Sequence, residues 1–350
     1  MSRLDLSVFE DVRLPPDDSI PIIMVMGATG AGKSYFINQL VDKSLATVAT
    51  EGSSLDSCTQ NCTLIPVHIG ATAALIIDTP GFDDNSRSDS EILDEIAKVV
   101  TVQSGLGFDL KGIIYIHRIT DIRYPGSAIK TLEIFKRICG DEALSNVILA
   151  TSRWGEVDEI TGAQRECELR QKFWSYMLNK GSTMARYYGD RESARAIAAQ
   201  MIIKPSVLFK LQDEIVNKDK TLDQTAAGSL LIDEMSRLEI DQEKELQELE
   251  TSRRQCSKKD KKLRQLTSKV AQLQQQLDSA KRQQASLRKN IKNDVTEKVK
   301  TVKGGENKWL RRTKKLKPFI GPAINVLLAF IGLPPCFGLS ASGLVEFFQT

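Results

Sequence analysis

The 350-residue sequence predicts an α/β fold, in which a doubly wound, mostly parallel sheet is followed by a long helical coiled coil and an apolar C-terminal segment. Three observations lead to this prediction. Short apolar runs alternate with helical patterns up to residue 155, apolar residues recur at heptad spacing after residue 229, and residues 318–345 contain no charged side chain. Alternation of strands and helices is typical of a parallel sheet with helices on both faces.

The predicted strands are the apolar runs 20–26, 63–69, 73–79, 112–119 and 146–152. A turn at Gly70 separates the second and third runs, which predicts a hairpin and therefore one antiparallel edge strand. Helical spacing predicts helices at 34–41, 90–100, 127–140, 161–180, 190–203 and 205–217.

Composition divides the chain into five predicted segments. They are a flexible arm (1–19), a globular nucleotide-binding domain (20–228), a coiled coil or long helices (229–303), a basic linker (304–317) and an apolar tail (318–350).

A glycine-rich loop follows the first strand, where residues 27–34 read GATGAGKS. This spacing is that of the P-loop, in which bare glycine backbone lets N–H groups close around phosphate oxygens. The N-terminus of the next helix adds partial positive charge. The sequence therefore predicts a P-loop NTPase, in which Lys33 reaches the outer phosphates and Ser34 ligates Mg²⁺. The residues expected to bind the nucleotide here are Gly27, Ala28, Thr29, Gly30, Ala31, Gly32, Lys33, Ser34 and Tyr35.

A second motif, Asp78-x-x-Gly81, comes at the end of the run 73–79. A carboxylate at a strand end beside the P-loop is expected to hold Mg²⁺ through water, and the Gly81 N–H to contact the γ-phosphate. A threonine is also expected to close over Mg²⁺. Thr50, Thr59 and Thr63 are candidates, and we favour Thr59 because it lies in a polar stretch before a strand. The predicted metal ligands are Ser34, Thr59 and Asp78, and the predicted catalytic groups are Lys33, Thr59 and Gly81.

Together, GATGAGKS, Ser57–Thr59 and DTPGFDD (78–84) resemble the motifs of septin-like, immunity-associated and chloroplast import-receptor GTPases. Over residues 20–235 the chain most resembles fungal G-domain proteins that carry LDQTAAGSLLIDEM (222–235) before a coiled coil. The resemblance implies a six-stranded switch domain that binds GTP/GDP with Mg²⁺. It also implies that the base is contacted after the strand 146–152, by Thr151, Arg153 and Trp154, and by a later loop at 186–190.

Two departures from the family pattern bear on this function. Gly155 stands where relatives have the Asp that accepts two hydrogen bonds from guanine. Charge-assisted bonds of this kind contribute about 1.5–3 kcal/mol each, so the guanine preference is open, with Asp158 as one substitute. Phe82 stands where Ras-like proteins have the Gln that orients water. We therefore expect slow GTP hydrolysis. Asp83 and Asp84 either orient that water or lie in a solvated loop.

These departures leave alternatives open. The main hypothesis is a Mg²⁺-dependent guanine-nucleotide switch and weak GTPase that couples nucleotide state to self-assembly or membrane association. The alternative is a nucleotide-binding scaffold with relaxed base specificity and little turnover. An ATP-dependent enzyme such as a kinase is disfavoured, because the sequence shows no phosphoacceptor site.

Heptad spacing covers residues 263–291, where eight of the nine core positions are apolar. This predicts a coiled coil or a long helical hairpin, through which the chain is expected to form a homo-oligomer. The upstream residues Leu238, Leu246 and Leu249 do not keep this register, which predicts a stutter near 250–262. A solvated helix that packs back on the globular domain is the alternative.

Positive charge gathers towards the C-terminus. Residues 250–317 hold 22 Lys/Arg and 6 Asp/Glu in a chain of net charge +3, and the uncharged run 318–345 follows directly. Cations next to an apolar segment are typical of attachment to anionic membranes. The tail could instead dock on the chain's own domain or coil, or bind a partner protein. Trp309 is the lone aromatic among the cations of residues 308–317, so we expect no specific nucleic-acid binding.

Six scattered cysteines form no disulfide framework and no zinc-ligand spacing. The N-terminus lacks an apolar signal core. We therefore expect a cytoplasmic protein, peripheral to or anchored at an intracellular membrane. Both histidines, His68 and His117, lie in strand-like runs and are expected to be structural.

Overall fold

The computed structural model describes residues 19–41, 62–82, 87–122, 124, 126–255, 261–306 and 327. The predicted positions Thr50, Thr59, Asp83 and Asp84 lie outside these residues. So do most of the basic linker and all of the apolar tail except Leu327.

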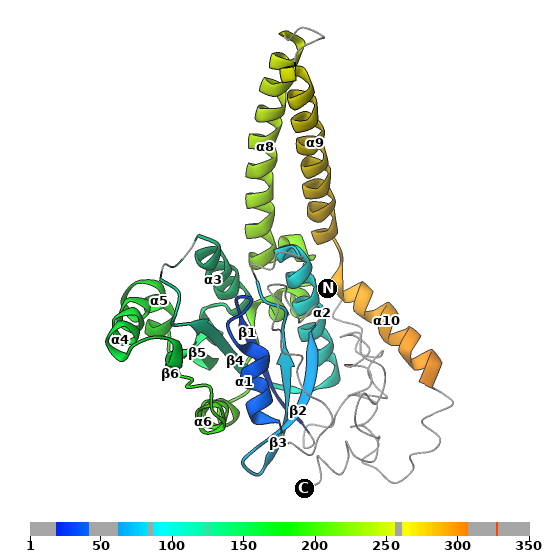
Figure 1. Ribbon diagram of the computed structural model, residues 1–350. Helices are drawn as coiled ribbons and strands as arrows, with labels where there is room; N and C mark the ends of the chain where they lie inside the picture. Colours follow the sequence, from blue (N-terminus) through cyan, green and yellow to red (C-terminus); the bar gives the residue numbers. More distant parts are fainter. Residues whose placement is uncertain are drawn as a thin grey trace.

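A six-stranded sheet forms the centre of the body, in the order β2-β3-β1-β4-β5-β6 (Figure 1). β2 runs antiparallel to β3 at one edge, and the other neighbouring strands are parallel. This confirms the mostly parallel sheet with one antiparallel edge strand. The strands are β1 (Pro21–Gly27), β2 (Thr63–Ile69), β3 (Thr72–Asp78), β4 (Asp109–Arg118), β5 (Val147–Ser152) and β6 (Thr183–Arg186).

The central strands are apolar throughout because both faces of the sheet are covered. In β1, Ile22 and Met24 face one hydrophobic core, and Ile23 and Val25 face the other. A parallel sheet buried on two faces requires such continuous apolar runs. β6 was not among the predicted runs, because its four residues are only half-buried or exposed.

Helices cover both faces of the sheet (Figure 1). α1 (Lys33–Leu40) and α6 (Arg191–Ile202) contribute to one core, and α2 (Asp89–Leu106) and α3 (Gly126–Cys139) to the other. α2 begins with a capping box in which the Ser88 hydroxyl accepts from Glu91 N and the Glu91 carboxylate accepts from Ser88 N. These two bonds satisfy donors that a helix start otherwise leaves unpaired.

The region after β5 is built of short helices. They are η4 (Trp154–Glu156), α4 (Glu159–Glu168), the π-helical turn η5 (Leu169–Phe173) and α5 (Ser175–Asn179) before β6, and α7 (Lys210–Gln212), the π-helical turn η6 (Asp213–Asn217) and η7 (Leu222–Gln224) after α6. The 3-10 helix η3 (Asp141–Asn146) precedes β5. The helix predicted over 161–180 is therefore interrupted, and the one predicted over 205–217 begins at residue 210.

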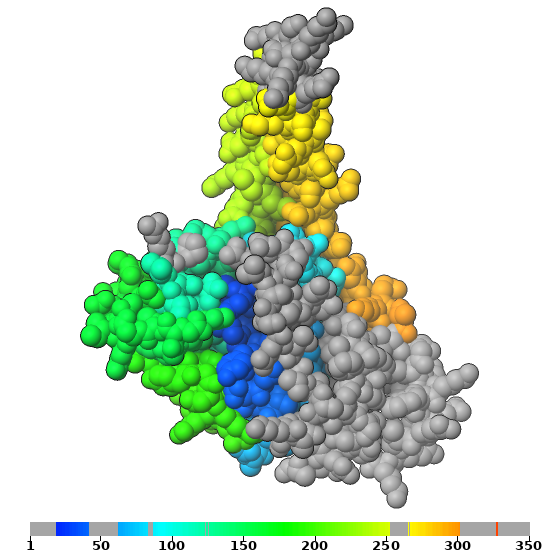
Figure 2. Space-filling model, viewed as in Figure 1, coloured from blue at the N-terminus to red at the C-terminus, as the bar shows by residue number. Residues whose placement is uncertain are grey.

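Two long helices, α8 (Ala226–Gln255) and α9 (Lys261–Leu287), pack along each other and project from the body (Figures 1 and 2). The Gln284 amide, at the one polar heptad position, donates to Ser236 Oγ at 3.1 Å. The stutter predicted near 250–262 stays a prediction, since residues 256–260 lie outside the described residues. A coiled coil between chains stays a prediction. The heptad residues that are buried are Val270, Leu273, Leu277, Leu287 and Ile291.

α10 (Ile291–Glu306) lies against α2 on the body and buries Val295 and Val299 fully. Leu327, the single described residue of the tail, is also fully buried and belongs to the same hydrophobic core. Across the described residues, no helix combines the length and apolarity that crossing a membrane requires. The five segment boundaries inferred from composition stay predictions.

Candidate functional site

The loop between β1 and α1 has a backbone that only glycine adopts easily. Gly30 and Gly32 have φ angles of 75° and 92°, in the left-handed region where a Cβ is strained. Gly27 approaches β4 so closely that a Cβ there would lie 2.2 Å from the carbonyl oxygen of Ile116. The three glycines of the predicted P-loop are therefore required by its shape.

Lys33 fills the inside of this loop. Its side chain is buried, and Nζ donates to the carbonyl oxygens of Gly27 at 3.2 Å and Ala28 at 3.0 Å. Lys33 is also the first residue of α1, whose N-terminus carries partial positive charge. The ammonium and the helix terminus both carry the positive charge that suits this loop to an anion.

Two of the three predicted metal ligands, Ser34 and Asp78, lie in contact. Ser34 Oγ donates to Asp78 Oδ2 at 2.8 Å, and the carboxylate is buried at the end of β3. The next residue, Thr79, donates its hydroxyl to the Val25 carbonyl at 2.9 Å, which holds the strand end in place. A hydroxyl and a carboxylate are the hard oxygen ligands that Mg²⁺ prefers, so these residues fit the ion.

The segment after β3 lies directly on the P-loop. Thr29 N donates to the carbonyl oxygen of Phe82 at 3.3 Å. A Cβ added to Gly81 would lie 2.4 Å from Thr29 Oγ1, so only glycine fits there. The Phe82 side chain is fully buried in the core.

The end of β5 is also tied to the P-loop. Ser152 Oγ donates to the Ala31 carbonyl at 2.8 Å. Arg153, in the left-handed region with φ 63°, donates from Nη2 to the Gly30 carbonyl at 3.1 Å. Ser152 was not among the predicted site residues. Its only signal in the sequence is a small polar residue at a strand end.

Trp154 packs against the protein itself. Its Nε1 donates to the carbonyl and hydroxyl oxygens of Thr151, both at 3.1 Å. The Arg186 guanidinium lies 4.2 Å from the centre of a Trp154 ring. The hydrogen bonds that Arg186 donates to the Glu166 carboxylate raise the pKa of its guanidinium and keep it charged. A contact of Trp154 or Thr151 with a nucleotide base stays a prediction.

The loop at 186–190 contacts α1, and its role as a base-contacting loop stays a prediction. The Tyr35 hydroxyl donates to the Gly189 carbonyl at 3.1 Å, and the Tyr187 ring meets Phe36 edge-on at 5.1 Å. The P-loop, the segment after β5 and the loop at 186–190 therefore meet around the start of α1, although they are far apart in the sequence.

Comparison with known proteins agrees with this geometry. The sequence profile described as "50S ribosome-binding GTPase" matches residues 22–119, which contain the P-loop, β3 and all of β4. This part of the chain is a P-loop GTPase G domain. No curated protein sequence matches the chain.

Solved structures similar to the G domain include Toc33 from Arabidopsis thaliana with GDP and Mg²⁺, at 14% identity and a TM-score of 0.40, covering 58% of this chain and 100% of that one. Toc33 with Mg²⁺ and GMPPNP matches at 16% identity and a TM-score of 0.40, covering 56% and 88%. A bacterial selenocysteine-specific elongation factor matches at 16% identity and a TM-score of 0.37, covering 53% and 28%. Because these TM-scores lie below 0.5, the function proposed below rests on this chain's own residues and on the family match.

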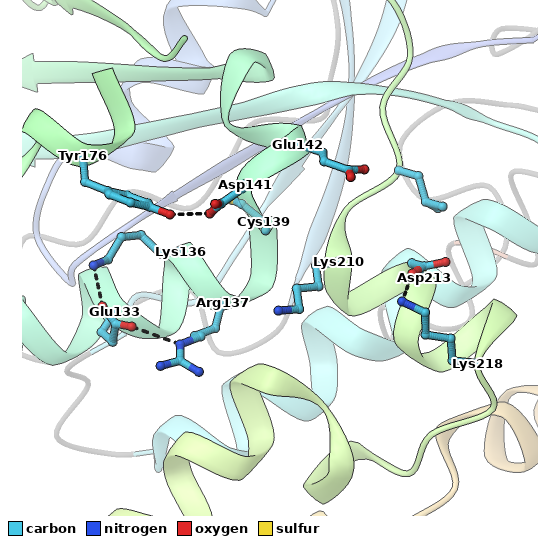
Figure 3. Close-up of a pocket in the computed structure, with 12 residues that line it drawn as sticks. Glu133, Lys136, Arg137, Cys139, Asp141, Glu142, Tyr176, Lys210, Asp213 and Lys218 are labelled. Carbon is cyan, nitrogen blue, oxygen red and sulfur yellow. Dashed lines mark hydrogen bonds and ion pairs between the residues drawn. The ribbon is translucent and has the colours of Figure 1, made fainter. Parts of the chain in front are cut away.

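A second hollow of the G domain is separate from the P-loop. It has a volume of about 750 Å³ and lies beside the C-terminal end of α3, α5 and the turn η6 (Figure 3). Most of its charged side chains have a partner, since the Tyr176 hydroxyl donates to Asp141 at 2.6 Å and Lys218 lies 2.6 Å from Asp213. We assign it no function.

Proposed function

We propose that this chain is a Mg²⁺-dependent guanine-nucleotide-binding switch with slow GTP hydrolysis. The observation that carries the proposal is the placement of the Ser34–Asp78 pair, 2.8 Å apart, beside a glycine loop that holds Lys33. A matched GTPase profile over residues 22–119 supports the guanine class.

Each group has a defined task in this proposal. Backbone N–H groups of the loop and Lys33 bind the phosphates, and Ser34 and Asp78 hold Mg²⁺. The bound ion would neutralise charge on the phosphate oxygens. Thr59 is proposed to complete the metal shell, although it lies outside the described residues. Because the Gly81 segment rests on Thr29, its N–H is the group proposed to detect a γ-phosphate.

Slow hydrolysis is proposed from the surroundings of Phe82. Its side chain is fully buried and has no hydrogen-bonding atom that could orient water. The Phe82 carbonyl accepts a hydrogen bond from Thr29 N, so the backbone at Phe82 holds this segment against the P-loop. The chain is therefore proposed to hold its nucleotide longer than a Ras-like enzyme with a glutamine at this position.

Coupling to the rest of the chain is supported by an ion-pair bridge. Lys130 on α3 lies 2.9 Å from Asp89 at the start of α2 and 2.8 Å from Glu234 on α8. α2 is the helix that follows the Gly81 segment. A shift of that segment would thus reach the α8–α9 hairpin, the surface proposed for self-assembly.

The test of nucleotide binding is a calorimetric titration of the full chain with GTP, GDP and ATP. The Lys33→Ala variant is expected to lose binding, and Lys172→Ala in the turn η5 is the matched control because it removes an exposed lysine elsewhere. Micromolar binding retained by Lys33→Ala would contradict the proposal. Equal affinity for ATP and GTP would favour the alternative of a scaffold with relaxed base specificity.

Membrane association is the second part of the proposal. The basic linker next to an uncharged run supports it, whereas buried Leu327 supports docking of the tail on the body. Liposome flotation of the chain with and without residues 304–350 separates the two. Equal flotation of both proteins would contradict a membrane role for the tail.

A further inference from the structure

We infer that the carboxylate of Glu156 reads the guanine base, in place of the aspartate that is missing at Gly155. This inference rests on the nucleotide-binding function proposed above. It adds a residue that determines base specificity, and it assigns that role to a side chain that the sequence pattern alone did not select.

One guanidinium connects Glu156 to the P-loop. Arg153 donates from Nη2 to the Gly30 carbonyl at 3.1 Å, and from Nη1 to both carboxylate oxygens of Glu156, at 3.0 and 3.2 Å. The carboxylate is therefore held near the loop that binds phosphate. Glu156 remains accessible there, with 56% of its side chain exposed.

The neighbouring acids after β5 either bond elsewhere or lie further along the chain. Asp158 caps α4 by accepting from Thr161 N at 2.9 Å, and this bond lowers the pKa of its carboxyl. Glu166 is paired with Arg186, with the closest contact at 2.6 Å. Glu159 lies in the first turn of α4, beyond that cap.

Glu156 has acceptor capacity left for a ligand. An ionised carboxylate offers about four acceptor sites, and the one nitrogen of Arg153 occupies only part of them. The space at the neighbouring Gly155 is open, because a Cβ there would meet nothing within 4 Å. Glu156 follows Gly155 directly, and its side chain is one methylene longer than that of an aspartate, which lengthens its reach.

The chemistry of the bases makes this residue selective. Guanine presents two neighbouring donors, N1–H and the N2 amine, which match the two oxygens of a carboxylate. Adenine presents an acceptor at N1, and xanthine has a carbonyl oxygen at C2. A carboxylate at this edge of the base therefore favours guanine over both other bases.

The test is titration of the full chain with the Mg²⁺ complexes of GDP, ADP and xanthosine diphosphate. Wild type is expected to prefer GDP. Glu156→Gln should weaken GDP binding by about tenfold or more, leave ADP binding unchanged, and improve xanthosine diphosphate binding because the amide can donate to the C2 carbonyl. Glu159→Gln is the matched control, with an unchanged GDP-to-ADP ratio.

A rescue variant distinguishes lost base recognition from misfolding. Adding Gly155→Asp to Glu156→Gln should restore the GDP preference, because the open space at residue 155 accepts the new carboxylate. If the ratio of GDP to ADP affinity is unchanged in Glu156→Gln, or if wild type binds GDP and ADP equally well, the inference about Glu156 is wrong. The proposed nucleotide-binding function would stand. Nucleotide binding that survives Lys33→Ala would overturn the proposed function instead.

Discussion

The hydroxyl of Ser34 donates to the carboxylate of Asp78 at 2.8 Å, although the two residues are 44 positions apart in the sequence. Ser34 belongs to the first helix, and Asp78 ends a strand that pairs with β1 in parallel. Parallel neighbours place their carboxyl ends at the same edge of a sheet, where ligands bind in α/β folds. The pairing of β1 with β3 therefore builds the candidate metal site.

Asp78→Asn tests this site. The amide keeps a hydrogen bond to Ser34 but removes the charge that Mg²⁺ requires. We expect the variant to bind nucleotide equally with Mg²⁺ and with EDTA, whereas wild type should bind more tightly with Mg²⁺. Paired titrations in the two buffers measure this. Full Mg²⁺ dependence in the variant would exclude Asp78 as a ligand.

Gly81→Ala tests the contact between the Gly81 segment and the P-loop. The new Cβ would lie 2.4 Å from Thr29 Oγ1 and 2.5 Å from Thr29 N, so the segment must move away. We expect a lower melting temperature and faster proteolysis near residue 82. Gly155→Ala is the control, because its Cβ would meet nothing within 4 Å. Equal stability of the two variants would contradict the close approach.

Lys130→Met tests the bridge between α2 and α8. Methionine keeps most of the side-chain length but cannot pair with Asp89 and Glu234. We expect nucleotide affinity to be preserved and any nucleotide-dependent change in the α8–α9 hairpin to be reduced. Hydrogen exchange of the hairpin amides, with and without GTP, measures that change. The same exchange pattern as in wild type would rule out the bridge as the coupling element.

His117 predicts a pH dependence of stability. Burial lowers the pKa of its imidazole from 6.5 to about 4, with Asp121 opposing the shift and Arg118 adding to it. Between pH 4 and pH 6.5 this imidazole is therefore mostly protonated in the unfolded chain and mostly neutral in the folded chain. The stabilisation is complete above pH 6.5 and is lost as the pH falls towards 4, by about 3 kcal/mol.

Urea unfolding of wild type and His117→Phe at pH 7 and pH 4.5 measures this contribution. From pH 7 to pH 4.5 the free energy of unfolding should decrease more in wild type than in the variant. The carboxylates titrate equally in both proteins, so the difference between the two reports His117. Equal slopes would show that His117 does not titrate in this range. The ring contacts of His117, with Tyr124 at 5.1 Å and Trp174 at 5.9 Å, suit a phenylalanine at this position.

Much of the fold could be predicted because its signals are local. The runs that form β1 to β5 are apolar on both faces. This pattern can be recognised without knowing which strands pair with one another. β6 is four residues long and partly exposed, so its pairing with β5 gives it the strand structure that its composition does not signal. The π-helical turn at Leu169–Phe173 likewise interrupts a helix that sequence spacing predicts as continuous.

The candidate site divides in the same way. Lys33, Ser34, Asp78 and Gly81 are visible in the sequence because phosphate and Mg²⁺ chemistry fixes residue types at short spacings. Thr59 stays a prediction, since it lies outside the described residues. Ser152 and Glu156 have no motif of their own. Their candidacy comes from contacts with Ala31, and with Gly30 through Arg153, which chain folding alone brings near.

By itself, the sequence determined a parallel sheet and a phosphate loop, because apolar periodicity and bare glycine backbone are properties of neighbouring residues. The tertiary structure decided which acid is held beside the P-loop, which helix the Lys130 bridge reaches, and where α10 and Leu327 are buried. Those outcomes depend on distances between segments that are remote in sequence, and burial and hydrogen bonding act on distance in space.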